Sequence, residues 1–321
     1  MINIFYKKDG TIELAQSVSA LRELEPEKVI WIDLLAPSGE EKHTVEDFLQ
    51  IEIQSRAEAE EIESSSRFWE EENAIYANTN FMRPGPDEYS MEPVSFTIVG
   101  NALTTLREVP LRSLTELQRR MMANPKQYAT GFHVFVTILD QRVDLDADMI
   151  EIMAKEIGQY SRRVNQEEDI NEDFVLDINQ LQENAMLVRE NVVDKQRLIS
   201  NLLRSPKIPK ELDSRLGVLL QDISSLINHA NFSFERLEYL QDTVLGLINL
   251  DQNRIMKVFT LVSLLLMPPT LIASFFGMNV RLPIIGSLNP GESPWNWVII
   301  IGVMLISFGT IWFIFKKKKF L

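Results

Sequence analysis

The sequence predicts an α+β cytosolic domain, then a long helical stalk, then two C-terminal transmembrane helices. Two charge-free apolar runs, at 258–276 and 295–315, are each long enough to cross a ~30 Å hydrocarbon core as a helix. Before them, proline is absent between Lys210 and Pro268 while apolar residues recur every three or four positions. The N-terminal part mixes strand and helix patterns. The expected domains are residues 1–130, 131–250 and 251–321, with membrane helices at about 257–277 and 295–315.

The N-terminal domain carries clear strand and turn signals. The segment MINIFYKKDGTIEL predicts two short strands around an Asp9-Gly10 turn, and VIWIDLL predicts a buried strand. A helix should begin near Ser38, with Glu41 in the capping-box position. NAIYANTNF and VSFTIVGNALTTLRE predict further strands, the latter with a turn at Gly100, and the prolines of RPGPDEY predict a loop.

The middle of the chain is predicted to be helical. Two long amphipathic segments, starting near Gly131 and ending before SPKIP, predict a helical hairpin. The following stalk helix would be on the order of 90 Å long if it runs unbroken into the membrane. Its apolar seam should meet either neighbouring chains or the hairpin of the same chain. The seam consists of Leu212, Leu216, Leu219, Ile223, Leu226, Ala230, Phe234, Leu237, Val244 and Leu247.

Composition excludes several classes of function. The formal charge of −14 argues against a nucleic-acid partner, which requires a basic face. There is no cysteine for a thiolate site, and the three histidines are far apart in sequence. No P-loop, nucleotide fingerprint or catalytic constellation is present, so we expect no enzyme. Most of the acidic runs, such as DQRVDLDADMIE, should form solvated helix faces.

The charges that flank the apolar runs predict the orientation in the membrane. Arg254 and Lys257 precede the first run, whereas the connecting loop carries only Arg281 and Glu292. By the positive-inside rule both termini are cytosolic, in a multi-pass protein of the plasma (inner) membrane that contacts its lipids. A lysine cluster follows the second run and forms either a simple anchor or a basic ring around a pore mouth. It comprises Lys316, Lys317, Lys318 and Lys319.

One stripe of the first membrane helix is polar. Its members are spaced alternately three and four residues apart, which keeps them on one side of a supercoiled helix. They could line a pore, pack against other helices, or bond their own i−4 carbonyls. Because two helices cannot enclose a channel, a pore requires several chains around an axis. The stripe consists of Asn253, Met256, Thr260, Ser263, Met267, Thr270 and Ser274.

The stripe leads to Gly277-Met278-Asn279. This tripeptide, the proline in LMPPTLIASFFGMN, the short loop, the second helix and the closing FKKKKFL resemble the CorA family of magnesium channels. VIWIDLLAPSGEE and IESSSRF are similar to the family as well, so the resemblance spans essentially the whole chain.

The resemblance implies a funnel-shaped homopentamer that moves hydrated Mg²⁺, or Co²⁺ or Ni²⁺, into the cytosol. It implies that Gly277, Met278 and Asn279 form the outer selectivity site. Four positions of the polar stripe match pore-lining positions of the family: Asn253, Met256, Met267 and Thr270. It also implies gating by intracellular Mg²⁺ held by carboxylates between subunits, with Asp242 as a candidate. Mg²⁺ would thus be both cargo and regulator.

The loop departs from the family pattern. Many members follow the tripeptide with MPEL, whereas this chain has VRLPIIG, with Arg281 two residues after Asn279. Arriving cations would therefore meet a less negative potential, which leaves the preferred ion open. Two alternatives to a magnesium channel remain: a zinc transporter of the same fold, and a membrane-anchored sensor or scaffold without a pore.

Overall fold

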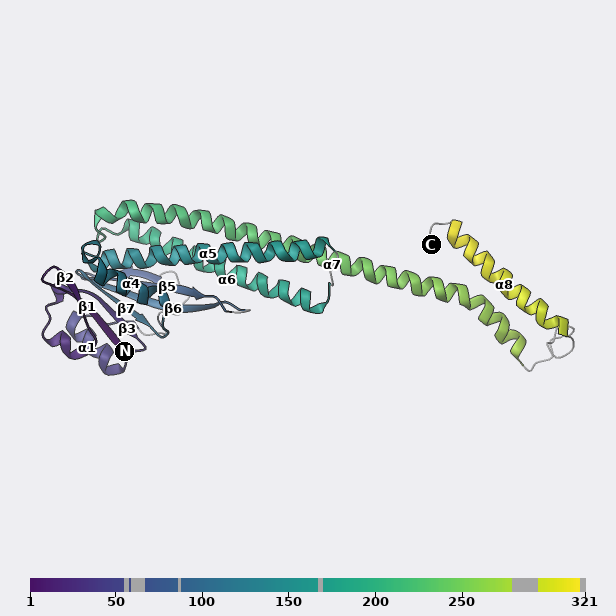
Figure 1. The fold of residues 1–321 in the computed structure, drawn as a ribbon, viewed down its shortest axis with the longest axis horizontal. Coiled ribbons are helices and arrows are strands. Elements are labelled where there is room, and N and C mark those ends of the chain that lie inside the picture. Colours follow the sequence, from purple (N-terminus) through teal and green to yellow (C-terminus); the bar gives the residue numbers. More distant parts are fainter. Residues whose placement is uncertain (55–57, 59–66, 86–87, 167–169, 279–293, 318–321) are drawn as a thin grey trace. The chain divides into compact units, whose positions relative to one another are not determined.

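The computed structural model describes residues 1–54, 58, 67–85, 88–166, 170–278 and 294–317. By its internal contacts the chain divides into two compact units, Met1–Asp242 and Thr243–Leu321, called here the first and the second unit. Each unit is described by itself, and the elements are labelled in Figure 1. The predicted domain boundaries at residues 130 and 250 stay predictions.

A seven-stranded sheet forms the base of the first unit, with strand order β2-β1-β3-β7-β6-β5-β4. All neighbouring strands are antiparallel except β3 and β7, which run parallel. This mixed sheet agrees with the predicted α+β class. The strands are β1 Ile2–Lys8, β2 Thr11–Ala15, β3 Val29–Leu35, β4 Phe68–Glu70, β5 Ala74–Arg83, β6 Ser90–Val99 and β7 Ala102–Arg107.

Local sequence signals explain the turns and the first helix. Asp9 and Gly10 both have positive φ, at 49° and 82°, and join β1 to β2, as predicted. Gly100, with φ of 55°, turns β6 into β7. Helix α1, Gly39–Leu49, begins with the predicted capping box, in which Ser38 and Glu41 satisfy each other's backbone amides.

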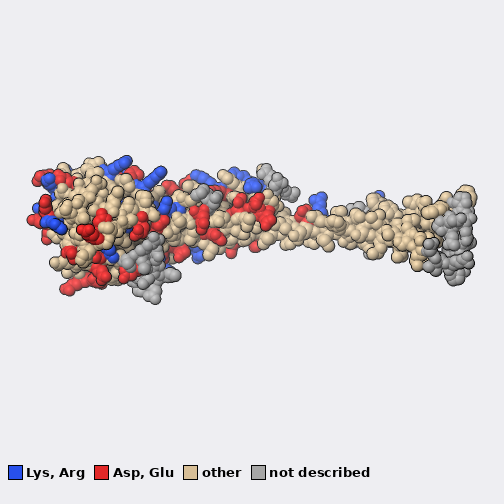
Figure 2. Space-filling model, turned by 90° about the horizontal axis from the view of Figure 1, so that it is seen from below, with Lys and Arg blue, Asp and Glu red and all other residues tan. Residues whose placement is uncertain are grey.

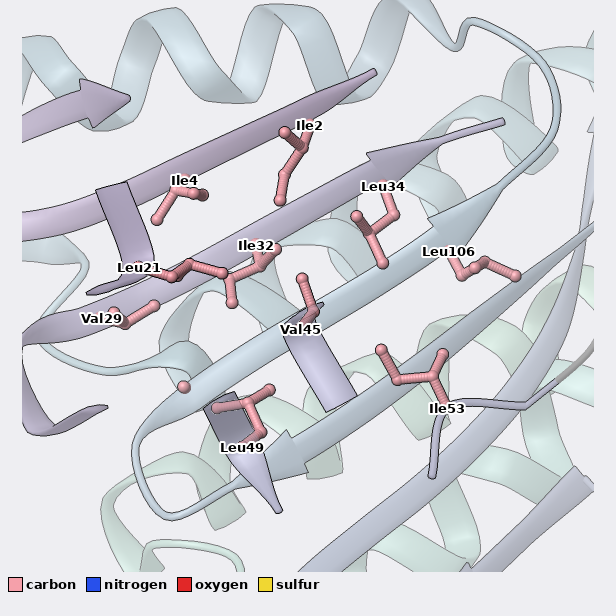
Figure 3. Close-up of a cluster of buried hydrophobic side chains, with 11 residues drawn as sticks. Ile2, Ile4, Leu21, Val29, Ile32, Leu34, Val45, Leu49, Ile53 and Leu106 are labelled. Carbon is pink, nitrogen blue, oxygen red and sulfur yellow. The ribbon is translucent and has the colours of Figure 1, made fainter. Parts of the chain in front are cut away.

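The core on one face of the sheet is aliphatic. Alternate residues of β1 and β3 point to α1, where Val45 and Leu49 meet them (Figure 3). Leu21, from the 3-10 helix η1, closes this cluster. Packing of α1 on the strands removes these side chains from water. The resulting stabilisation of the fold scales with the apolar area that is buried. The sheet members of the cluster are Ile2, Ile4, Val29, Ile32, Leu34, Ala102 and Leu106.

Helices cover the other face of the sheet. The hairpin helices contact β3, β5 and β7, and α4 contacts β2 and α5. The first residue of the hairpin, Gly131, packs closely on β7. Glycine is required here because a Cβ would lie 2.4 Å from the amide nitrogen of Leu103. The hairpin was predicted, whereas α4 was not. The helices are α4 Arg112–Ala123, α5 Gly131–Asn165 and α6 Glu172–Arg204, with 3-10 helices η1 Val18–Arg22, η2 Pro26–Lys28, η3 Pro125–Gln127 and η4 Lys210–Leu212.

The stalk helix α7 runs without interruption over Asp213–Gly277 and contributes residues to both units. In the first unit its seam is buried at Leu216, Leu219, Ile223 and Leu237. Polar contacts tie this part of α7 to the hairpin of the same chain: Arg215 Nη2 to Asp140 Oδ2 at 2.7 Å, Gln196 Nε2 to Ser224 Oγ at 3.2 Å, and Gln241 Nε2 to Asn179 Oδ1 at 2.9 Å. Of the two alternatives for the seam, packing on the same chain's hairpin is therefore confirmed for this part.

A buried ion pair joins two central strands. The carboxylate of Asp33, fully buried on β3, accepts two bonds from Arg107 of β7, from Nε at 3.0 Å and from Nη2 at 2.8 Å. Thr105 Oγ1 and Gln118 Nε2 each donate to the same carboxylate at 2.8 Å. Both oxygens are thus saturated, as a buried carboxylate requires.

Candidate functional site

Two described helices are long and apolar enough to cross a membrane: the C-terminal part of α7, and α8, Pro294–Lys317. On the face seen in Figure 2, charged side chains gather over the first unit, and few lie on the described part of the second unit. α7 remains helical through Pro268 and Pro269, although each proline lacks the amide that would bond the carbonyl four residues earlier.

The polar stripe lies along the exposed surface of α7. All seven of its members are exposed in the single chain, and Met256 and Met267 are 62% and 66% exposed. Exposure alone does not single out the stripe, because most of this helix is exposed. The stripe is distinguished by its position, because it lies opposite the side of α7 that is covered by other residues of the same chain.

The covered side of α7 is opposite to the stripe. In the membrane part of the helix, six residues are less exposed than the others, and they too recur every three or four positions. At about 100° per residue, this set is centred on the side of the helix away from Thr260, Met267 and Ser274. The six are Leu261, Leu265, Pro268, Pro269, Ile272 and Phe276.

α8 shows the matching pattern. Asn296 and Ile300 are buried, and Met304, Ser307 and Ile311 are half-buried on the same helical face. One covered face on each helix is typical of two helices packed against each other. The chain therefore leaves the polar stripe to whatever surrounds it: other copies, lipid or water.

Two hydroxyls of the stripe bond to their own helix. Thr260 Oγ1 donates to Met256 O, and Thr270 Oγ1 donates to Leu266 O, each at 2.8 Å. This is the i−4 bond expected as one alternative to a pore-lining role. Because the hydroxyl hydrogen is used inside the helix, each oxygen presents only lone pairs outward. The bond is therefore compatible with a surface that accepts hydrogen bonds.

The helix ends at the predicted tripeptide. Gly277 is the last residue of α7, and the amide of Met278 donates to Phe275 O at 3.4 Å. Gly277 does not adopt positive φ, and a Cβ placed on it would meet nothing within 4 Å. Neither backbone conformation nor crowding within one chain therefore requires glycine here. Met278 is 59% exposed, and Asn279 lies outside the described residues.

The remaining predicted site residues are less informative. Lys316 and Lys317 form the last turn of α8, whereas Lys318 and Lys319 lie outside the described residues. Asp242 is exposed on α7. No group of three or more His, Cys, Asp or Glu residues that could hold a metal ion occurs within the described part of a single chain. A regulatory role for Asp242 stays a prediction.

Sequence reasoning missed a buried ionic cluster in the first unit. Asp146, from the acidic run expected to be solvated, is 2% exposed and lies 2.8 Å from Lys195 Nζ. Burial lowers the pKa of Lys195, and the charge of Asp146 acts in the opposite direction. Arg142 Nη2 donates to Met82 O at 2.7 Å, and Lys195 Nζ donates to Asn80 O at 3.2 Å. The expectation of a solvated face is thus wrong for Asp146, which helps to fasten the hairpin to β5.

A protein-family model and relatives of similar length point to one family. The family model described as CorA-like Mg²⁺ transporter protein matches residues 26–317. The magnesium transport protein CorA of Wolinella succinogenes is 32% identical over 327 residues, covering all of both chains. The protein of the same description from Campylobacter jejuni strain RM1221 is 32% identical over 332 residues, again over both full lengths. The solved structure of the CorA magnesium transporter from Methanocaldococcus jannaschii has a TM-score of 0.81 at 17% identity, covering 100% of this chain and 99% of that one, which shows the shared fold.

Proposed function

The chain belongs to the CorA-like Mg²⁺ transporter family, and we propose from this premise that it forms a channel for hydrated Mg²⁺. Several copies, five by the family resemblance, surround a pathway lined by the polar stripe of α7. The channel spans the inner membrane with both termini in the cytosol and carries the ion inward. Co²⁺ and Ni²⁺ are the other candidate cargoes.

The observation that carries this proposal is the opposition of two faces on α7. The chain covers the face that contains Leu265, Pro269 and Ile272, and it leaves the face that contains Thr260, Met267 and Thr270 uncovered. Polar side chains that faced lipid would gain nothing from their hydroxyls. A ring of chains that turned these faces inward would give the oxygens an aqueous partner.

The chemistry of the stripe suits an ion that keeps its water. Mg²⁺ is small and gives up coordinated water reluctantly. Its waters point their hydrogens outward and therefore require acceptors. The oxygens of Thr260 and Thr270 are restricted to accepting by their intrahelical bonds. Such neutral contacts hold a hydrated ion weakly enough to let it leave, as conduction needs.

The outer site in this proposal is Gly277-Met278-Asn279. The amide oxygens of Asn279 and the carbonyls of Gly277 accept bonds from the waters of the entering ion, and Met278 contributes to selectivity as a packing residue. A single chain leaves space for a side chain at Gly277. Its absence therefore matters only where several chains meet, where it keeps the ring of Gly277 carbonyls wide. Intracellular Mg²⁺ bound between subunits by carboxylates such as Asp242 neutralises their charges and closes the channel. When the ion leaves, the like charges repel each other and push the subunits apart, which opens it.

The direct test is transport by purified full-length protein in liposomes. We expect Mg²⁺ to enter down its gradient, with flux measured by an enclosed fluorescent indicator, both with and without a proton gradient. Parallel assays with Co²⁺, Ni²⁺ and Zn²⁺ order the cargoes. A liposome that stays closed to Mg²⁺ but admits Zn²⁺ would reassign the protein to zinc transport, and one closed to all four ions would support the scaffold alternative.

Replacing Thr270 by valine should reduce Mg²⁺ flux by at least about tenfold, because each chain around the pathway loses one acceptor worth about 1 kcal/mol. Valine has nearly the shape of threonine but offers no oxygen to the waters of the ion. The matched control is Thr310→Val on α8, whose hydroxyl makes the same i−4 bond, to Ile306 O. The control should transport like the wild type. Equal losses in the two variants would mean that the effect comes from the helix and not from the pathway.

A further inference from the structure

Two members of the polar stripe carry no oxygen in their side chains. Five of the seven are Asn, Thr or Ser, and the other two are Met256 and Met267. The two methionines lie eleven residues apart, which is about 16 Å along the helix at about 1.5 Å per residue. The stripe therefore has two separate levels at which a thioether stands in place of an oxygen.

Each methionine lies between residues that offer acceptor oxygens. Along the stripe, Met267 follows Ser263 and precedes Thr270, and Met256 follows an asparagine and precedes Thr260. A thioether sulfur is only a weak acceptor, so the waters of a passing ion lose a partner at both levels. An apolar level in a pathway also tends to exclude water, which opposes conduction.

Both methionine side chains are open to the surroundings of the single chain. Met256 and Met267 are largely exposed, whereas Met304, on the covered face of α8, is half-buried. The first two belong to the face of α7 that the chain leaves uncovered. In the proposed channel this face meets the aqueous pathway, so a solute that travels in water reaches both sulfurs.

An exposed thioether reacts with peroxides. A lone pair of the sulfur attacks one oxygen of hydrogen peroxide, so that an S–O bond forms as the O–O bond breaks. The second oxygen leaves as water after it takes up the proton of the first. The sulfur loses two electrons and the peroxide gains them, so no other reactant is needed. The product, methionine sulfoxide, is polar, and reductases convert it back to methionine.

From the exposure of Met256 and Met267 and their position between acceptor oxygens, we infer that hydrogen peroxide oxidises both residues and that this modification raises Mg²⁺ flux. The inference rests on the proposed channel. A sulfoxide oxygen accepts hydrogen bonds and has no hydrogen to donate. Both levels would then resemble those of Thr260 and Thr270, whose hydroxyl hydrogens are used inside the helix. The waters of the ion would meet an acceptor at every level of the stripe.

The test uses the full-length protein in liposomes that enclose the fluorescent Mg²⁺ indicator. The liposomes are treated with hydrogen peroxide, catalase removes the excess, and an ionophore calibrates the indicator at the end of each trace. We expect flux to rise at least about threefold, because each oxidised side chain adds a neutral hydrogen bond worth about 1 kcal/mol. Peptide mass spectrometry of the same samples should find sulfoxide early at Met256 and Met267, and much later at Met304.

The double variant Met256→Leu, Met267→Leu should show no rise, because neither level retains a thioether. The ratio of flux after and before treatment is taken within each variant, so a change in basal flux does not enter. The two single variants should each keep part of the rise, which keeps the test decisive if the double variant does not transport. Met186→Leu is the matched control: this residue of α6 is 56% exposed and lies outside the stripe, so its removal should leave the rise unchanged.

A wild-type protein that transports Mg²⁺ but responds to peroxide with unchanged or lower flux would overturn the inference alone. An equal rise in the double variant would do the same, because the effect would then come from another residue. Oxidation of Met267 no faster than that of Met304 would also contradict it, since the sulfur would then lie outside an aqueous path. Protein that transports no divalent ion before treatment would overturn the proposed function and this inference with it.

Discussion

Replacing Asn279 by alanine is expected to abolish Mg²⁺ uptake while leaving the assembly intact. In the proposed channel each chain contributes one amide oxygen to the hydrated ion at the outer mouth. Each lost bond corresponds to about 1 kcal/mol. Because every subunit loses its bond at once, the combined effect around a ring of chains is on the order of a thousandfold in ion occupancy. The methyl group of alanine offers no acceptor to the waters of the ion in any conformation.

This result is measured as Mg²⁺ flux into liposomes, together with the mass of the solubilised particle by light scattering. Asn289→Ala is the matched control, since it removes the same amide from the same connecting segment. It should transport normally. Normal flux in Asn279→Ala would remove the tripeptide from the selectivity site, and a change in particle mass would point to a role in assembly instead.

The largest expected effect on stability is that of Asp33→Ala. The substitution leaves Arg107 buried on β7 with its partner removed, and it strands the donors Thr105 and Gln118. Breaking a buried pair by removing one partner costs about 3–5 kcal/mol. Since domains are stable by only about 5–15 kcal/mol, this is a large fraction of the stability of the first unit.

The measurement is the urea midpoint of the full-length protein in detergent, followed by circular dichroism. Asp33→Asn keeps the shape and one acceptor, so it should fall between Asp33→Ala and the wild type. Glu13→Ala removes a surface carboxylate that pairs with Lys8 at 3.1 Å and accepts a hydrogen bond from Tyr6 Oη at 2.8 Å. It should shift the midpoint much less than Asp33→Ala does, because water screens the ion pair and one neutral donor is lost. Equal shifts in Asp33→Ala and Glu13→Ala would contradict the structural role of the buried pair.

Much of the fold could be predicted because its signals are local. Ser38 and Glu41 are three residues apart, and the Asp9-Gly10 turn depends on the backbone preferences of two neighbouring residues. Helix α4 was missed although Leu114, Leu117 and Met121 have helical spacing, because charged residues separate them. The burial of Asp146 could not be predicted, since its partner Lys195 lies on another helix and only tertiary packing brings the two together.

In the candidate site, too, some features follow from local sequence and others depend on packing. The stripe on α7 follows from sequence spacing alone, and the structure adds which side of the helix the chain covers. The proposed central pathway depends on contacts between copies, so its geometry would be a property of the assembly and not of one chain.

The inward direction of the threonine hydrogens has a consequence for anions. A chloride ion that reached the level of Thr260 or Thr270 would need hydrogens to replace those of its water, and both hydroxyl hydrogens already point to backbone carbonyls. The same wall would thus repel halides and admit metal ions by the orientation of its dipoles, without a carboxylate at either level. Discrimination by the sign of charge would then originate in the secondary structure of the helix itself.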